Sequence, residues 1–181
     1  MTLAEYQATP EVVTPQELIF GAIVAKDAPS VPHQRVVFAM ARALHSHCAR
    51  HGGEVLIAPT DVVLDREQAL ALQPDLLYLA PTSTALVGDR VIGAPDLVVE
   101  VLSPNPRVGR LDDKVRWYAH YGVREIWLYH QFSRQLDVLN TVNGAVRSVR
   151  RHFHAQAIES AVLPNLDLRV GEIVGGGTAT F

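Results

Sequence analysis

Apolar positions along the chain recur at two different spacings, one typical of helices and one typical of strands. In residues 31–52 they return every three or four residues and two glycines follow, which predicts a helix that ends there. Residues 109–122 show a second helical pattern, with acidic side chains in the first turn and Gly122 at the end. Shorter apolar runs bounded by Gly, Pro, Asn or Asp predict strands, at 18–25, 54–65, 73–81, 94–104, 125–130, 135–142 and 146–154.

The order of these elements predicts the fold class. Helices are set among the strands, and Asn143-Gly144 predicts a tight hairpin turn between the last two strands. We therefore expect an α/β (α+β) fold in which helices flank a central mixed β-sheet, with an extra C-terminal hairpin. Residues 163–174 close the fold, and the length suits a single domain over residues 1–181, with 175–181 as a frayed tail.

The amino-acid composition limits the classes of protein to which the chain can belong. The 181 residues are 48% hydrophobic and 19% charged, as in globular proteins, and no apolar run reaches the ~18–20 residues that cross a bilayer. No secretion signal is evident and Cys48 is the only cysteine, so we expect a cytoplasmic protein without an intrachain disulfide. A net charge of −3 argues against a surface covered in phosphate-binding cations, but it allows a local basic groove. Only two of the 16 basic residues are lysines, Lys26 and Lys114.

Two carboxylates interrupt the apolar run at 94–104. Asp96 and Glu100 lie inside it, although fully buried acids are uncommon unless they are paired. The structural explanation is a hydrogen bond to a loop or a pair with an arginine, and the functional one is a site. Alternation along a strand puts both on one face, but four residues of strand span ~13 Å at ~3.3 Å each. The two carboxylates therefore cannot readily hold one ion, and a metal partner for Glu100 has to come from another strand.

Asp75, in the predicted strand 73–81, is the candidate partner. This strand and 94–104 follow one another and can pair antiparallel, and a register that places Asp75 opposite Glu100 would bring their Cβ atoms ~5 Å apart. Carboxylates at that separation repel one another unless a cation lies between them or one is protonated. A hard divalent ion such as Mg²⁺ fits, because it binds one or two carboxylates together with water and phosphate.

Two basic residues could complete such a site. Lys114 lies three residues after Leu111 and four before Tyr118, so it shares the inward side of the second predicted helix. Its ammonium either extends to solvent along that side or points at the carboxylates, where it would neutralise a phosphate. His33 begins the first helix, where it could cap the helix, pair with Glu17 or contact substrate. No Gly-rich phosphate loop occurs, so no organic cofactor is expected.

Six segments in order carry a resemblance to a known family. They are ELIFGAIV (17–24), HQRVV (33–37), QPDLLYL (73–79), PDLVVEVLSPNP (95–106), DDKVRWYAHYGVREIWLY (112–129) and LPNLDL (163–168). Together they resemble the Uma-type family of putative restriction endonucleases, formerly a domain of unknown function, within the PD-(D/E)xK nuclease superfamily. The resemblance implies a restriction-endonuclease-like core and Mg²⁺-dependent hydrolysis of DNA, with Mn²⁺ as a substitute ion. We expect such a nuclease to be a homodimer, while the cytoplasmic location and the lack of a membrane segment are expected from the composition.

The resemblance also implies residue roles. Asp75 and Glu100 would be the catalytic metal ligands, and Glu17 would be a supporting catalytic acid that positions water or a second ion. The superfamily lysine stands two residues after the strand glutamate, a place that Leu102 occupies here, so Lys114 from the following helix would take its role. Asp96 matches the family's PD motif, as a ligand or as a structural acid, and ranks below Asp75.

Departures from the family pattern support an alternative. Phe20 stands where the family usually has an acid, Ala22 stands where it often has Glu, and WLYH (127–130) replaces WLVD. The alternative is a catalytically inactive nucleic-acid-binding or assembly module of the same fold.

Overall fold

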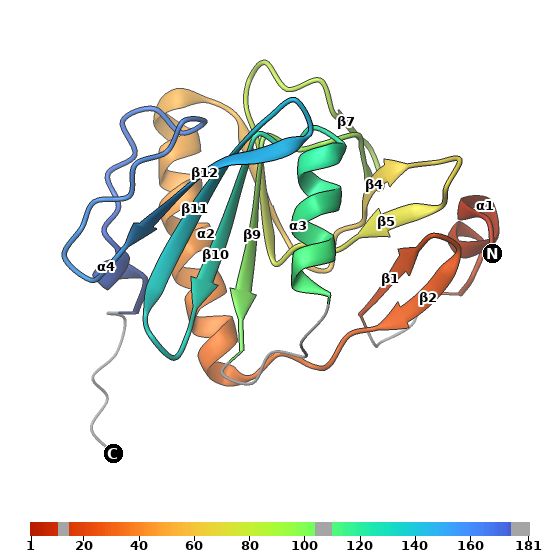
Figure 1. Cartoon of the computed structure of the whole chain (residues 1–181), viewed down its shortest axis with the longest axis horizontal. Coiled ribbons are helices and arrows are strands. Elements are labelled where there is room, and N and C mark those ends of the chain that lie inside the picture. Colours follow the sequence, from red (N-terminus) through yellow and green to blue (C-terminus); the bar gives the residue numbers. More distant parts are fainter. Residues whose placement is uncertain (11–14, 104–109, 175–181) are drawn as a thin grey trace.

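A computed structural model of the chain describes residues 1–10, 15–103 and 110–174 (Figure 1). The predicted tail at 175–181 lies outside the described residues. The helices of the described part are α1 (Leu3–Gln7), α2 (Val31–His51), α3 (Leu111–His120) and α4 (Val170–Val174). Its strands are β1 (Gln16–Ile19), β2 (Ala22–Ala25), β3 (Glu54–Ile57), β4 (Val62–Asp65), β5 (Leu70–Leu72), β6 (Leu76–Leu79), β7 (Leu86–Val87), β8 (Val91–Ile92), β9 (Leu97–Leu102), β10 (Glu125–His130), β11 (Gln135–Val142) and β12 (Ala145–His152).

The long helix α2 forms where the apolar periodicity predicts it. Ser30 caps its N-terminus by accepting a hydrogen bond from the backbone N–H of His33 at 3.3 Å, and a proline occupies its first turn. Gly52 follows the helix with a φ of 79°, a conformation that glycine adopts without strain. The helix therefore presents one continuous apolar side, which includes Met40 and Leu44, to the sheet beneath it.

The central sheet is mixed, as the sequence predicts. Its strand order is β12-β11-β10-β9-β6-β3, in which β9 and β10 are parallel and the other neighbours are antiparallel. Helix α3 connects the two parallel strands, since parallel neighbours need a crossover. The β11–β12 hairpin turns at Asn143 and Gly144, with φ angles of 52° and 77°, which confirms the predicted turn.

A second six-stranded sheet lies beside the central one, with the order β2-β1-β5-β4-β8-β7. Helix α2 covers one face of the central sheet through a core that contains Trp127, while α3 and the second sheet cover the other face (Figure 1). Tyr118 of α3 belongs to this second core together with Val98 of β9 and Leu72 of β5. Glu100 shares the face of Val98, because side chains alternate along a strand, so it points toward α3 and the second sheet.

The sequence pattern was wrong about several strand boundaries. The single strand predicted at 18–25 is the β1–β2 hairpin, which turns at Phe20 and Gly21 with φ angles of 46° and 82°. The strand predicted at 54–65 is divided into β3 and β4, which belong to different sheets, because Pro59 cannot donate to a continuous ladder. Helices α1 and α4 and strands β5, β7 and β8 were not predicted, since two to five residues are too short for a periodic signal.

The described helices also bear on membrane association. In the part of the chain that the structure describes, no helix combines the length and the apolar character needed to cross a bilayer.

Candidate active site

The pairing of β6 with β9 brings the two predicted metal carboxylates together. Leu76 pairs with Val99 and Leu77 with Val98 in an antiparallel register. Continued by one residue, this register places Asp75 opposite Glu100. The predicted antiparallel pairing and its register are therefore confirmed, although a connection of more than ten residues separates the strands.

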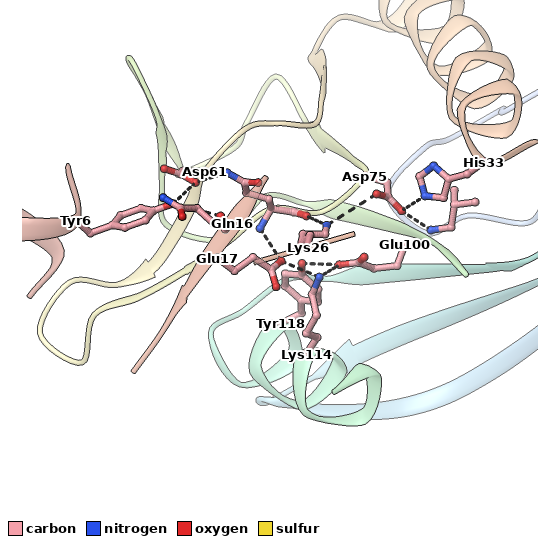
Figure 2. Close-up of polar contacts among 12 residues, drawn as sticks. Tyr6, Gln16, Glu17, Lys26, His33, Asp61, Asp75, Glu100, Lys114 and Tyr118 are labelled. Carbon is pink, nitrogen blue, oxygen red and sulfur yellow. Dashed lines mark hydrogen bonds and ion pairs between the residues drawn. The ribbon is translucent and has the colours of Figure 1, made fainter. Parts of the chain in front are cut away.

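Glu100 is buried and lies at the centre of a group of polar side chains (Figure 2). Its Oε1 atom accepts a hydrogen bond from the hydroxyl of Tyr118 at 2.8 Å and lies 2.5 Å from the Nζ atom of Lys114. Burial raises the pKa of Glu100, and the nearby carboxylates of Asp75 and Glu17 raise it further, so the lysines offset this only in part. Glu100 therefore takes up a proton more readily than a carboxyl group in water does.

Lys114 joins the carboxylates of two different elements. Its Nζ atom donates to Glu17 of β1 at 2.9 Å and contacts Glu100 of β9. Burial alone would lower the pKa of Lys114, but the charges of Glu100 and Glu17 raise it above its usual value, so the ammonium stays charged. Of the two orientations open for Lys114 in the sequence, the structure has the inward one.

One oxygen of Glu17 accepts two hydrogen bonds. The backbone N–H of Gln73 and the Nζ atom of Lys114 both donate to its Oε1 atom, each at 2.9 Å. Burial would raise the pKa of Glu17, but Lys114 and Lys26 hold it below its usual value. The β1–β2 hairpin thus contributes a charged carboxylate to a site otherwise built on the central sheet and α3.

Asp75 has its own set of partners. Its Oδ2 atom accepts a hydrogen bond from the backbone N–H of Val101 at 2.7 Å and lies 3.1 Å from Nε2 of His33. Its Oδ1 atom lies 4.0 Å from Nζ of Lys26. Burial would raise the pKa of Asp75, but the contacts with His33, Lys26 and Val101 lower it. Asp75 is therefore held as a carboxylate.

Two residues at this site, Lys26 and Tyr118, were not predicted from the sequence to belong to it. Lys26 donates to the backbone carbonyl of Gln73 at 2.7 Å and lies beside Asp75, so both lysines of the chain are at this site (Figure 2). The scarcity of lysine was the signal that could have identified it. Tyr118 was assigned to the apolar side of its helix. Its spacing of four residues from Lys114 places both side chains on one helix face, and this spacing was the available signal.

Asp96 and His33, the two supporting candidates for the site, have different surroundings. Asp96 accepts hydrogen bonds from the backbone N–H of Ala80 at 2.8 Å and from Arg124 at 3.0 Å, so its carboxylate orders the start of β9. His33 contacts Asp75, and Glu17 has other partners. The structure therefore brings His33 to the site and gives Asp96 a structural environment.

A cavity of about 450 Å³ opens beside these side chains. Its wall includes Glu17, Lys26, His33, Asp75 and Glu100. The volume is within the range of small-molecule sites, which is about 300–1,000 Å³. Lys114 is not among the lining residues, so within the described part of the chain its ammonium acts on the cavity through the carboxylates that it contacts.

The donor set of the cavity fits a hard divalent cation. Carboxylate oxygens are the ligands that Mg²⁺ prefers, with water and phosphate as further ligands. In the described ranges no three His, Cys, Asp or Glu side chains are grouped closely enough to hold a metal ion, so Asp75 and Glu100 would be the side-chain ligands of such a cation. A cation between them would relieve the repulsion that contributes to the raised pKa of Glu100.

Comparisons with known proteins show the family and the fold of the chain. Residues 3–171 match the family model Uma2, described as "Putative restriction endonuclease". Among solved structures, the chain is similar to a protein from Anabaena variabilis ATCC 29413 described as a putative nuclease belonging to DUF820. The TM-score is 0.79 at 16% sequence identity, over 96% of this chain and 97% of the other, which shows a shared fold. No curated protein matches the sequence.

Proposed function

Because the chain belongs to the Uma2 family, described as putative restriction endonucleases, we propose that it is a metal-dependent DNA endonuclease. The observation that carries the proposal is the β6–β9 register, which places Asp75 and Glu100 side by side on the wall of one cavity. A buried pair of carboxylates is costly without a cation, and such pairs recur where hydrolytic enzymes bind divalent metals.

In this proposal Asp75 and Glu100 hold the cation, Mg²⁺ or Mn²⁺. The chemistry that the bound cation supplies is acidification of water and stabilisation of charge on a phosphate. His33 and the backbone N–H of Val101 fix the orientation of Asp75. Tyr118 does the same for Glu100 through its hydroxyl.

The other charged residues have separate roles in the proposed reaction. Glu17 positions the attacking water, and Lys114 keeps the carboxylates of Glu17 and Glu100 ionised and oriented. Lys26 lies on the cavity wall, where its ammonium can meet a phosphate oxygen as negative charge develops. The water oxygen forms a bond to phosphorus, the bond from phosphorus to the leaving sugar oxygen breaks, and that oxygen takes up a proton.

Cleavage of supercoiled plasmid DNA tests the proposal. Wild-type protein should nick the plasmid with Mg²⁺ or Mn²⁺ and not with EDTA. The variants Asp75→Asn and Glu100→Gln should fall below about a hundredth of the wild-type rate, because each removes a ligand charge. Asp112→Asn and Glu67→Gln make the same chemical changes at exposed positions and should cleave like wild type.

A non-catalytic protein would give a different result in this cleavage experiment. A protein that binds DNA without cleaving it under any of these metals, or that cleaves equally in all variants, would overturn the catalytic proposal. The first result would favour the inactive nucleic-acid-binding or assembly module. The homodimer stays a prediction, which light scattering on the purified protein tests.

A further inference from the structure

A second cavity, of about 460 Å³, is lined by α2, the end of β10 with the turn that follows it, and α4. We call it the arginine groove and define it by Arg35, Phe38 and Arg42 of α2 with Gln131 and Arg134 of the β10–β11 turn. Its volume is comparable to that of the candidate active site and is sufficient for a small organic group. No role in the proposed catalysis falls to any of these five residues.

The groove is electropositive in a chain whose net charge is −3. Arg35, Arg42 and Arg134 are exposed, and none of them forms an ion pair within the described residues. The one acid on the wall is Glu172, whose carboxylate accepts a hydrogen bond from the backbone N–H of Arg169 at 2.7 Å. Three arginines against one carboxylate leave an excess of positive charge that favours an anionic occupant, and guanidinium groups match phosphate geometry.

Exposed aromatic rings accompany the arginines. Phe38 is 69% exposed on the wall of the groove, and Phe132, between Gln131 and Arg134 in the turn, is 89% exposed. Large apolar side chains this exposed lose the benefit of burial. Aromatic rings combined with arginines are the usual arrangement for single-stranded nucleic acid, in which unpaired bases stack on the rings. Bases inside a duplex are not available for such stacking.

Residues that are neighbours in the chain line the arginine groove and the candidate active site. Val36 lines the groove and the next residue, Val37, lines the active-site cavity. At the ends of the strands, Gln131 of the groove donates to the carbonyl of Leu102 from both its backbone N–H and its side-chain amide. The residue after Leu102, Ser103, lines the active-site cavity. One strand of DNA could therefore continue from one cavity to the other.

From this arrangement we propose that the arginine groove binds single-stranded DNA that continues from the candidate active site, with phosphates on the arginines and a base stacked on Phe38. The inference rests on the proposed function, since it names the form of the substrate. It goes further in predicting that duplex DNA has to be unpaired beside the cut.

Binding without cleavage tests the inference separately from the enzyme activity. Fluorescence anisotropy with a labelled single-stranded oligonucleotide, in EDTA, should show tighter binding than a duplex of the same sequence. Phe38→Ala should weaken single-strand binding by on the order of tenfold. Arg42→Gln should lower the salt dependence of binding, by about 0.7 in the slope for each phosphate that the variant no longer neutralises.

Matched controls use exposed residues elsewhere on the chain. Phe153→Ala and Arg66→Gln should leave single-strand binding unchanged. Absence of single-strand binding, tighter binding of duplex than of single strand, or an unchanged affinity in Phe38→Ala would each overturn the inference, even if the wild type cleaves DNA. Single-strand binding that disappears in Phe38→Ala would support it, even if no cleavage is found.

Discussion

The candidate site depends on individual charges that compensate one another away from water. Glu17, Asp75 and Glu100 are buried carboxylates, and Lys26 and Lys114 are the cations nearest to them. The pKa shifts of the three carboxyl groups follow from this arrangement. Burial opposes their negative charge and the lysines favour it, and among the three only Glu100 has its pKa raised. The residue with the raised pKa is therefore the one that stands to gain most from an added cation.

The variant Lys114→Met tests this balance. It leaves the carboxylates of Glu17 and Glu100 buried without their shared ammonium, which should lower the free energy of unfolding by about 3–5 kcal/mol near neutral pH. Burial then raises both folded-state pKa values above the ordinary value of 4.5. As the pH rises above this value, the unfolded chain ionises first, so the destabilisation grows with pH.

Urea unfolding at about pH 5 and about pH 7 measures the effect of Lys114→Met. The loss of stability should be smaller at the lower pH. Arg116→Met, an exposed change on the same helix, should alter stability by less than about 0.5 kcal/mol at both values. An equal loss at both pH values in Lys114→Met would contradict the charge argument.

At the scale of elements, the site joins two sheets. Glu17 reaches it from the β1–β2 hairpin, Asp75 and Glu100 lie at the β6–β9 pair, and Lys114 comes from α3. The position of the hairpin therefore sets where the Glu17 carboxylate lies.

Replacement of Gly21 tests the contribution of that hairpin. Gly21 has a φ of 82°, and a Cβ atom there would lie 2.9 Å from the carbonyl oxygen of Met1. Gly21→Ala should lower the stability by about 1–2 kcal/mol and slow any cleavage, because the hairpin has to shift. Gly88→Ala is the matched control, since a Cβ atom at Gly88 would meet nothing within 4 Å. Thermal melting and cleavage rates equal to wild type in Gly21→Ala would contradict this account.

The sequence predicted long elements better than short ones. Residues 125–130 and 135–142 are strands with the predicted bounds, and 31–51 is a helix, because each has enough residues for a clear period. The β1–β2 turn was missed because a residue such as Phe20 rarely adopts a positive φ, and the single glycine beside it, Gly21, was the only local turn signal. Asp75 and Glu100 could be proposed as a pair because their strands follow one another, but the register was assumed until the structure supplied it. Lys26 and Tyr118 had only weak signals in the sequence, the scarcity of lysine and the spacing from Lys114, since their contacts depend on how the second sheet and α3 pack.

At the scale of the whole molecule, one apolar cluster connects the two sheets. It contains Leu72 of the second sheet, Val98 of the central sheet and Tyr118 of α3. We therefore propose that residues 1–181 form a single domain, in agreement with the length of the chain.

Cooperative unfolding tests the single-domain proposal. Tryptophan fluorescence reports on the surroundings of Trp117 in α3 and of Trp127 in the central sheet, while far-ultraviolet circular dichroism reports on the secondary structure of both sheets. The two signals should show one coincident transition in urea. Two separated transitions would contradict the proposal.

Calorimetric titration with Mn²⁺ tests the central claim, that Asp75 and Glu100 hold a divalent cation together. The wild type should bind Mn²⁺, with weaker binding at low pH because a proton on Glu100, whose pKa is raised, competes with the ion. Asp75→Asn and Glu100→Gln should each abolish this binding, while Asp112→Asn and Glu67→Gln should retain it. Equal Mn²⁺ binding in all five proteins, or no binding by the folded wild type, would contradict the account.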